Sequence, residues 1–130
     1  MSEVTVIQTV RDAIATKLDE IEGLTIYKSH PERGGGAVPY ACLTMIDVRM
    51  YGGFPDTRQY VDLLIQVDVW AYTPESRDIY VDKVIDKIYR SRSSFDFVDI
   101  LLRSCRDMPS EAELWRKVLE FKVTTIVTKS

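Results

Sequence analysis

A chain of 130 residues lies near the commonest size of a single domain, and we take residues 1–130 as one domain. Its hydrophobic fraction of 45% excludes a disordered chain. A net charge of -3, with no run of five like charges, excludes a general electrostatic attraction to nucleic acid.

The N-terminal segment is predicted to form an amphipathic helix from Val4 to Ile21. Its apolar residues recur every three or four positions, at Ile7, Val10, Ile14, Leu18 and Ile21. Ser2 is expected to cap its start and Gly23 its end. The segment lacks the apolar stretch of a signal peptide, and no later segment approaches the roughly 18 apolar residues of a membrane span. We therefore expect a protein made inside the cell, with no membrane segment.

Strands are predicted in the middle of the chain. Leu24–Lys28 is short and β-prone, and the glycine-rich stretch Ser29–Val38 is expected to be a loop. Pro39–Met50 is rich in apolar and β-branched residues, and Tyr60–Tyr72 alternates strictly, so the two form an antiparallel hairpin. The alternation places six residues on one face: Val61, Leu63, Ile65, Val67, Val69 and Ala71. It places Asp62, Gln66, Asp68 and Trp70 on the other.

Helices and one more strand are predicted in the last third. Thr73 can cap a helix that carries Pro74 in its first turn and runs to about Arg90. A second helical stripe is indicated by the spacing of Phe97, Val98, Leu101, Leu102 and Cys105. The following stretch RDMPSEAE is expected to be a polar loop, and Leu114–Thr128 the final strand.

These elements indicate an α+β fold. We expect a mostly antiparallel or mixed four-stranded sheet with the helices packed on one face. The other face is then left to solvent or to a neighbouring molecule.

The sequence offers no catalytic constellation. His30 is the sole histidine, so neither a histidine-based triad nor a multi-histidine metal site can be assembled. Cys42 and Cys105 lack the paired spacing of a zinc site and are interpreted as small buried thiols. No phosphate loop of the GxxxxGK[ST] type occurs. We expect no enzyme, no catalytic residue, no metal site and no cofactor.

One interpretation of the carboxylates on the predicted strands is a divalent-ion site. Asp62 and Asp68 share a strand face, and Asp47 is expected across the hairpin from them. Solvated carboxylates that keep the sheet face soluble are the preferred interpretation. The same holds for Asp82 and Asp86, one turn apart on the polar side of a helix.

Three aromatic residues indicate contact with a partner or with the core edge. Trp70 faces away from the core set and is interpreted as an interface residue, whereas Trp115 shares the parity of Phe121 and is expected at the core edge. Phe54 stands among glycines at the tip of the predicted hairpin, with little local core to enter. We expect Phe54 to dock into a partner.

Three passages together resemble the tail-terminator or tail-completion proteins of long-tailed bacteriophages, including the minor tail protein that caps siphophage tails. They are GLTIYKSHPERGGGAVPYACLTM, VDLLIQVDVWAYTPESRDIYVDKVIDKIY and ELWRKVLEFKVTTIV. The resemblance covers nearly the whole chain in size and element order. It lies in packing patterns, not in chemical motifs.

This resemblance implies a homo-oligomeric ring, expected to be a hexamer, at the head-proximal end of the virion tail of a phage or prophage. Such a ring binds the tail tube protein, stops tube polymerisation and offers a docking surface to the head connector or neck protein, after assembly in the host cytoplasm. DNA passes through it without specific binding. The implied contacts lie on loops and sheet edges, at Arg33, Phe54, Asp56 and Arg58.

Two other functions stay open at this point. One is a head-completion or neck adaptor protein in the same particle. The other is a small-ligand-binding regulatory domain that uses the outer face of the sheet.

Overall fold

A five-stranded mixed sheet forms the body of the protein, with strand order β1-β2-β3-β5-β4. The computed structural model describes residues 3–28, 39–51, 58–97, 99–111 and 114–128. The strands are β1 (Thr25–Tyr27), β2 (Tyr40–Tyr51), β3 (Arg58–Ala71), β4 (Asp99–Glu111) and β5 (Leu114–Thr128). β1 runs parallel to β2, and every other neighbouring pair is antiparallel.

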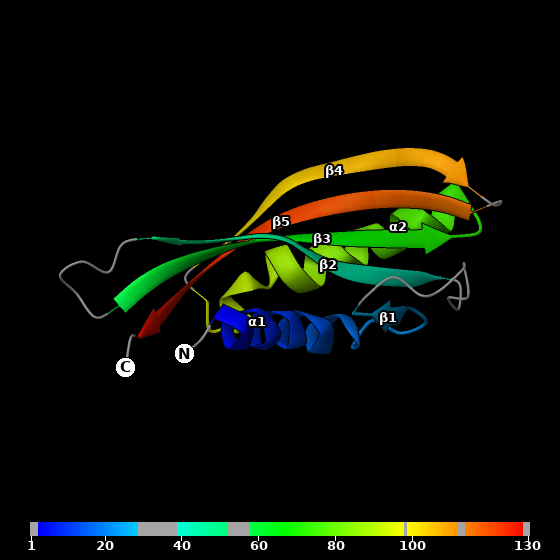
Figure 1. Ribbon diagram of the computed structural model, residues 1–130. Helices are drawn as coiled ribbons and strands as arrows, with labels where there is room; N and C mark the ends of the chain where they lie inside the picture. Colours follow the sequence, from blue (N-terminus) through cyan, green and yellow to red (C-terminus); the bar gives the residue numbers. More distant parts are fainter. Residues whose placement is uncertain (1–2, 29–38, 52–57, 98, 112–113, 129–130) are drawn as a thin grey trace.

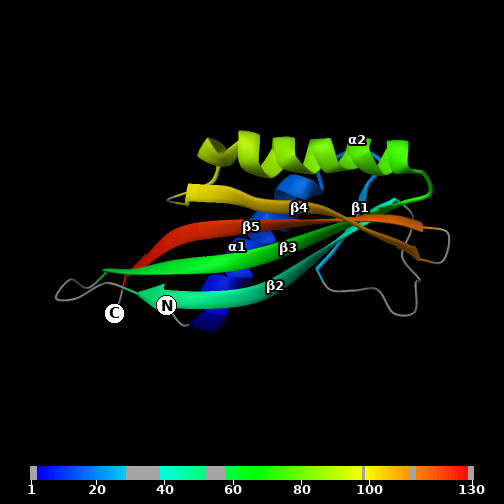
Figure 2. The same cartoon turned by 90° about the horizontal axis from the view of Figure 1, so that it is seen from above.

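Two helices cover one face of this sheet (Figures 1 and 2). They are α1 (Glu3–Leu18) and α2 (Pro74–Ile85), and their buried residues pack into one core with the sheet. The predicted α+β class and mixed sheet are confirmed, but the sheet has five strands, not four. No helix within the described residues is long and apolar enough to cross a membrane.

The core lies between the helices and the sheet face that they cover, which we call the inner face. The six residues predicted on one face of β3, Val61 to Ala71 in alternation, are all buried there, which confirms that prediction. From β5, Leu119, Phe121 and Val123 join them, and α1 contributes Val10, Ile14 and Leu18. Each such side chain contributes about 1.5–3 kcal/mol by leaving water, so this layer is the main source of stability.

The start of α2 follows the local chemistry that the sequence predicts. The backbone N–H of Ser76 donates to Thr73 Oγ1 at 3.1 Å, so the predicted cap of α2 is confirmed. The helix continues as a π-helical turn over Asp86–Arg90. α1 ends at Leu18 and not at Ile21, so the prediction that Gly23 caps this helix is wrong. Gly23 lies in the turn that follows and adopts φ +85°, where a Cβ would lie 2.8 Å from the Tyr80 hydroxyl oxygen. The predicted cap residue Ser2 lies outside the described residues.

The prediction of a second helical stripe between Phe97 and Cys105 is wrong, as is that of a polar loop after it. This region forms strand β4, which pairs with β5. Ile100 and Leu102 point inward and Leu101 points outward, but a register shift between Leu102 and Ser104 interrupts this alternation. A β-bulge adds one residue to the strand, so the period of two breaks and the spacing imitates a helix.

Candidate interaction surface

The sheet face opposite α1 and α2, which we call the outer face, is covered by no helix among the described residues (Figure 2). Cross-strand rows of side chains run over it. One row passes from Tyr40 through Trp70 to Arg116, at the end of the sheet near β1. Such a broad uncovered face is the first candidate for contact with another molecule.

An aromatic ladder crosses this end of the outer face. Tyr27 meets Tyr40 edge to face with ring centroids 5.6 Å apart, and Tyr40 stacks on Trp70 at 5.8 Å. The Arg116 guanidinium lies 4.9 Å from the centre of the Trp70 ring. Aromatic pairs and cation-π contacts of this kind each stabilise by about 0.5–1.5 kcal/mol beyond area burial. The ladder therefore joins strands β1, β2, β3 and β5 through side chains as well as through backbone hydrogen bonds.

The two tryptophans differ in exposure from the sequence-based expectation. Trp70 lies on the outer face, as predicted, but it is only 8% exposed. Trp115 is 38% exposed, with the Arg77 guanidinium 5.9 Å from its ring centre. Alternation assigned each tryptophan to a sheet face, but it does not say how far neighbouring side chains cover the ring. The interface role of Trp70 therefore stays a prediction.

A buried ion pair lies beside the ladder. Asp68 is fully buried and forms an ion pair with Arg116, and Gln66 Nε2 donates a hydrogen bond to its other oxygen at 2.8 Å. Burial, together with the Asp68 carboxylate, raises the pKa of the Cys42 thiol to about 11. Cys42 is therefore a poor nucleophile, and its burial confirms the prediction for this residue. Cys105 is exposed on β4, so the prediction of burial is wrong for that residue.

The other carboxylates considered as metal ligands are engaged by neighbours. Thr124 Oγ1 donates to Asp62 at 2.7 Å, and Arg49 Nε forms an ion pair with Asp47 at 3.0 Å. On the helix side, Arg90 forms ion pairs with Asp82 and Asp86. Across the described residues, no three His, Cys, Asp or Glu side chains are placed to hold a metal ion.

A groove of about 460 Å³ hollows the outer face between the ladder and the far end of β2, and we call it the central groove. Its lining residues come from all four long strands: Asp47, Arg49, Asp62, Leu64, Leu101, Arg103 and Lys122. The row from Asp47 through Leu64 and Lys122 to Leu101 forms its floor across adjacent strands. Charged and apolar side chains thus meet at one hollow.

Both sides of the sheet end in open edges. β4 is the last strand on one side. On the other side β1 pairs with β2 only from Tyr40 to Cys42, so the rest of β2 has no strand partner on that side within the described chain. Ile46 on β2 is 48% exposed, and Leu101 on β4 is 43% exposed. Unpaired backbone groups beside exposed apolar side chains are a template for pairing with another chain.

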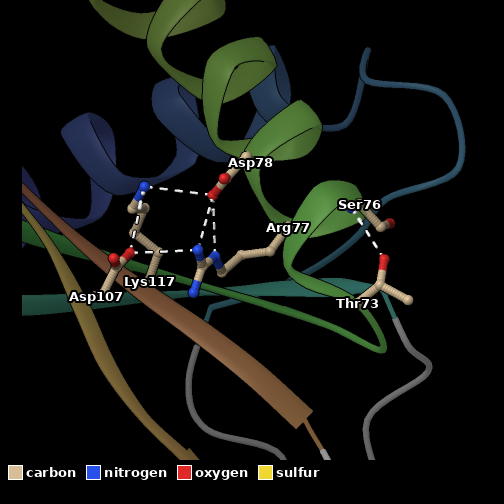
Figure 3. Close-up of polar contacts among 6 residues, drawn as sticks. All are labelled: Thr73, Ser76, Arg77, Asp78, Asp107 and Lys117. Carbon is tan, nitrogen blue, oxygen red and sulfur yellow. Dashed lines mark hydrogen bonds and ion pairs between the residues drawn. The ribbon is translucent and has the colours of Figure 1, made fainter.

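A polar cluster fastens α2 to the strand that forms one of these edges (Figure 3). Arg77 is buried and lies 3.0 Å from Asp78 and 3.4 Å from Asp107, and Lys117 lies 3.3 Å from each carboxylate. Burial raises the pKa of Asp78, but the hydrogen bonds from Arg77 and Lys117 outweigh it and lower the pKa below 3.8. The cluster holds β4 in place beneath the helix.

The structure describes only part of the set of residues that the sequence proposed for contact. Arg33, Phe54 and Asp56 lie outside the described residues. Arg58 opens β3, where its backbone pairs with Thr128, and its side chain is not among those described. Trp70 belongs to the ladder. The central groove was missed from the sequence, although the alternation of β3 placed Asp62 and Leu64 on its floor.

Comparisons with protein-family models and with curated proteins find no match. A search of solved structures finds a similar fold in a chain of the virion of a native gene transfer agent (GTA) particle. The TM-score is 0.65, the sequence identity is 12%, and the match covers 90% of this chain and 94% of that chain. At this identity the likeness shows a shared fold over nearly the full length of both chains.

Proposed function

We propose that this protein is a structural component of a phage-like virion, a ring-forming tail terminator that caps the tail tube and stops its polymerisation. One observation carries the proposal. The fold matches that of a chain in a gene transfer agent virion over 90% of this chain and 94% of that one. In this role the protein works by shape and catalyses no reaction.

The open sheet edges support ring formation. The edge of β4 and the open part of β2 lie on opposite sides of the same sheet. A contact between two different surfaces of identical chains is heterologous, and it closes into a ring when the rotation between neighbours allows. Each edge carries an exposed apolar residue, Leu101 or Ile46, that an adjoining copy would bury. We expect six copies in the ring.

Binding of such a ring to the end of the tail tube would also explain how tube growth stops. Tube subunits stack without limit until a ring binds whose far face accepts no further tube subunit. That far face then offers the joining surface for the head connector. Arg33, Phe54, Asp56 and Arg58 are the proposed contacts, and replacing Phe54 by alanine should leave folding intact while weakening docking. DNA would pass through the ring without specific binding, in keeping with the net charge of -3.

A neck adaptor in the same particle is the alternative that the virion similarity equally favours. A host that lacks the protein separates the two roles by the particles it accumulates. Loss of a tail terminator leaves tails of abnormal length without heads. Loss of a neck adaptor leaves tails of normal length beside filled heads. A regulatory domain would instead gain thermal stability with a small ligand, because a ligand that binds only the folded state raises stability.

The oligomeric state tests ring formation directly. Light scattering should give about six times the 14.9 kDa mass of one chain. Ile46→Glu places a charge on the open edge of β2 and should shift the protein to monomers. Ile79→Glu makes the same change at an exposed isoleucine on α2 and should leave the ring intact. A wild-type protein that stays monomeric even with tail tubes present, or equal loss of rings in both variants, would refute the edge-to-edge ring.

A further inference from the structure

We propose that the central groove binds a carboxylate-bearing side chain of a partner protein, with Arg103 and Lys122 as the contacts for the anion. The groove lies on the outer face of the sheet, away from the helices. Its volume of about 460 Å³ falls within the range of pockets that hold a ligand. The inference stands on this groove alone and does not require that the protein form a ring.

Two irregularities of the sheet lie at the groove, one on each side. The pairing of β2 with β3 shifts register between Met45 and Asp47, and the pairing of β4 with β5 shifts between Leu102 and Ser104. The residues at these bulges include Asp47 and Arg103, both of which line the groove. Bulges bend the strand and re-aim side chains, and they are concentrated beside functional sites. The hollow thus coincides with two local departures from a regular sheet.

The charges that remain without a partner in the groove are positive. Asp47 is paired with Arg49 at 3.0 Å, and Asp62 accepts a hydrogen bond from Thr124 at 2.7 Å. Arg103 and Lys122 make no hydrogen bond or ion pair with any residue that the structure describes. Both cations therefore have hydrogen-bond donors available, whereas the carboxylates beside them already have partners. An anionic ligand would satisfy these donors.

The floor of the groove indicates the form of that ligand. Lys122 is paired across the sheet with Leu64 on one side and Leu101 on the other. An anion bound at its ammonium group would therefore lie beside two apolar side chains. A glutamate or aspartate side chain provides both parts, because its methylene groups can contact leucine while its carboxylate meets the cations.

The carboxylates in the lining favour a protein over nucleic acid as the partner. Asp47 and Asp62 stand on the β2 and β3 side of the groove. A nucleic-acid backbone carries a charge on every phosphate, so a strand laid across the groove would meet these carboxylates as well as the cations. A single acidic side chain, presented by a folded partner, can reach Arg103 and Lys122 alone.

The test uses a fluorescein-labelled peptide with one glutamate between uncharged residues and the full chain, with binding read by anisotropy at low salt. Replacing both cations, Arg103→Gln with Lys122→Gln, should weaken binding at least tenfold. A control with the same loss of charge, Lys28→Gln with Arg90→Gln, removes exposed cations elsewhere and should change binding less than threefold. Thermal melts establish that both variants are folded.

A second measurement locates the bound peptide. The methyl resonances of Leu64 and Leu101 should shift on titration, while those of the core residue Leu18 should not. Several results would overturn the proposal: no binding by the wild type, equal weakening in both double variants, or shifts spread evenly over the protein. Tighter binding of a DNA duplex than of the peptide through Arg103 and Lys122 would replace the protein partner with nucleic acid.

Discussion

Replacing Arg116 with methionine should destabilise the fold strongly, because it removes the guanidinium that pairs with the buried carboxylate of Asp68. Asp68 is 0% exposed, and its side chain would keep the hydrogen bond from Gln66 but lose the guanidinium. Removing one member of a buried pair typically costs 3–5 kcal/mol. Arg116 itself is 20% exposed, which places the expected loss near the lower end, at about 3 kcal/mol. In a domain of this size that lowers Tm by roughly 10 °C.

Urea unfolding followed by tryptophan fluorescence measures this loss, with Arg106→Met as the matched control. Arg106 pairs with Glu120 at 3.3 Å on the same sheet face, but it is 59% exposed, so its loss should cost less than about 1 kcal/mol. Adding Asp68→Asn to Arg116→Met removes the buried negative charge and should recover more than half of the loss. Equal effects of the two arginine changes, or a double variant no more stable than Arg116→Met, would refute the reasoning.

Three further outcomes are expected from other parts of the structure. Thr73→Ala should lower the free energy of unfolding by about 1 kcal/mol, because it removes the side-chain cap of α2, whereas Thr73→Ser keeps the hydroxyl and should lose much less. Urea midpoints measure both variants, and equal losses would contradict the role of the cap. Burial raises the pKa of Asp78, but the hydrogen bonds from Arg77 and Lys117 outweigh burial and lower this pKa in the folded state. The stability that ionised Asp78 contributes is therefore present above about pH 4 and is lost as pH falls through the lowered folded pKa. Asp78→Asn should therefore reduce the fall in the free energy of unfolding between about pH 4 and more acidic pH. A fall as steep as that of the wild type would contradict this role of Asp78. Iodoacetamide at pH 8 should modify the exposed Cys105 and spare the buried Cys42. The pKa of about 11 leaves roughly a thousandth of the Cys42 side chain as thiolate at this pH. Peptide mass spectrometry that found Cys42 modified and Cys105 intact would contradict the burial pattern.

The sequence was most informative where a local pattern has one physical reading. Strict alternation over β3 predicted a strand with one buried face, and all six residues of that face are buried. Thr73 before α2 and Pro74 at its first position predicted the helix start, because capping depends only on neighbouring residues. The class of the fold followed from these elements.

Strand β4 and the central groove escaped prediction for a shared reason. The bulge between Leu102 and Ser104 breaks the alternation that identifies a strand, so the region resembled a helix. With β4 unrecognised, Arg103 could not be placed beside Lys122, since only the pairing of β4 with β5 brings them to one hollow. A site formed by side chains of several strands depends on how those strands pair. The residue pattern within one strand does not contain that information.

The burial of Trp70 illustrates a similar limit. Alternation assigned the residue to the outer face correctly, but Tyr40 and Arg116 cover its ring from neighbouring strands. Exposure therefore depends on cross-strand partners that are set by register, which the spacing within one strand does not contain. Trp115, at the start of β5, is left the more accessible of the two.

Tube growth in the presence of the purified protein tests the proposed function most directly. Tail tube subunits from the same particle would be polymerised with and without this chain, and tube lengths and ends would be measured by electron microscopy. The account predicts a ring at one end of each tube and an arrest of growth that Ile46→Glu abolishes. Tubes that elongate equally in both cases, with the protein free in solution as a monomer of 14.9 kDa, would contradict it.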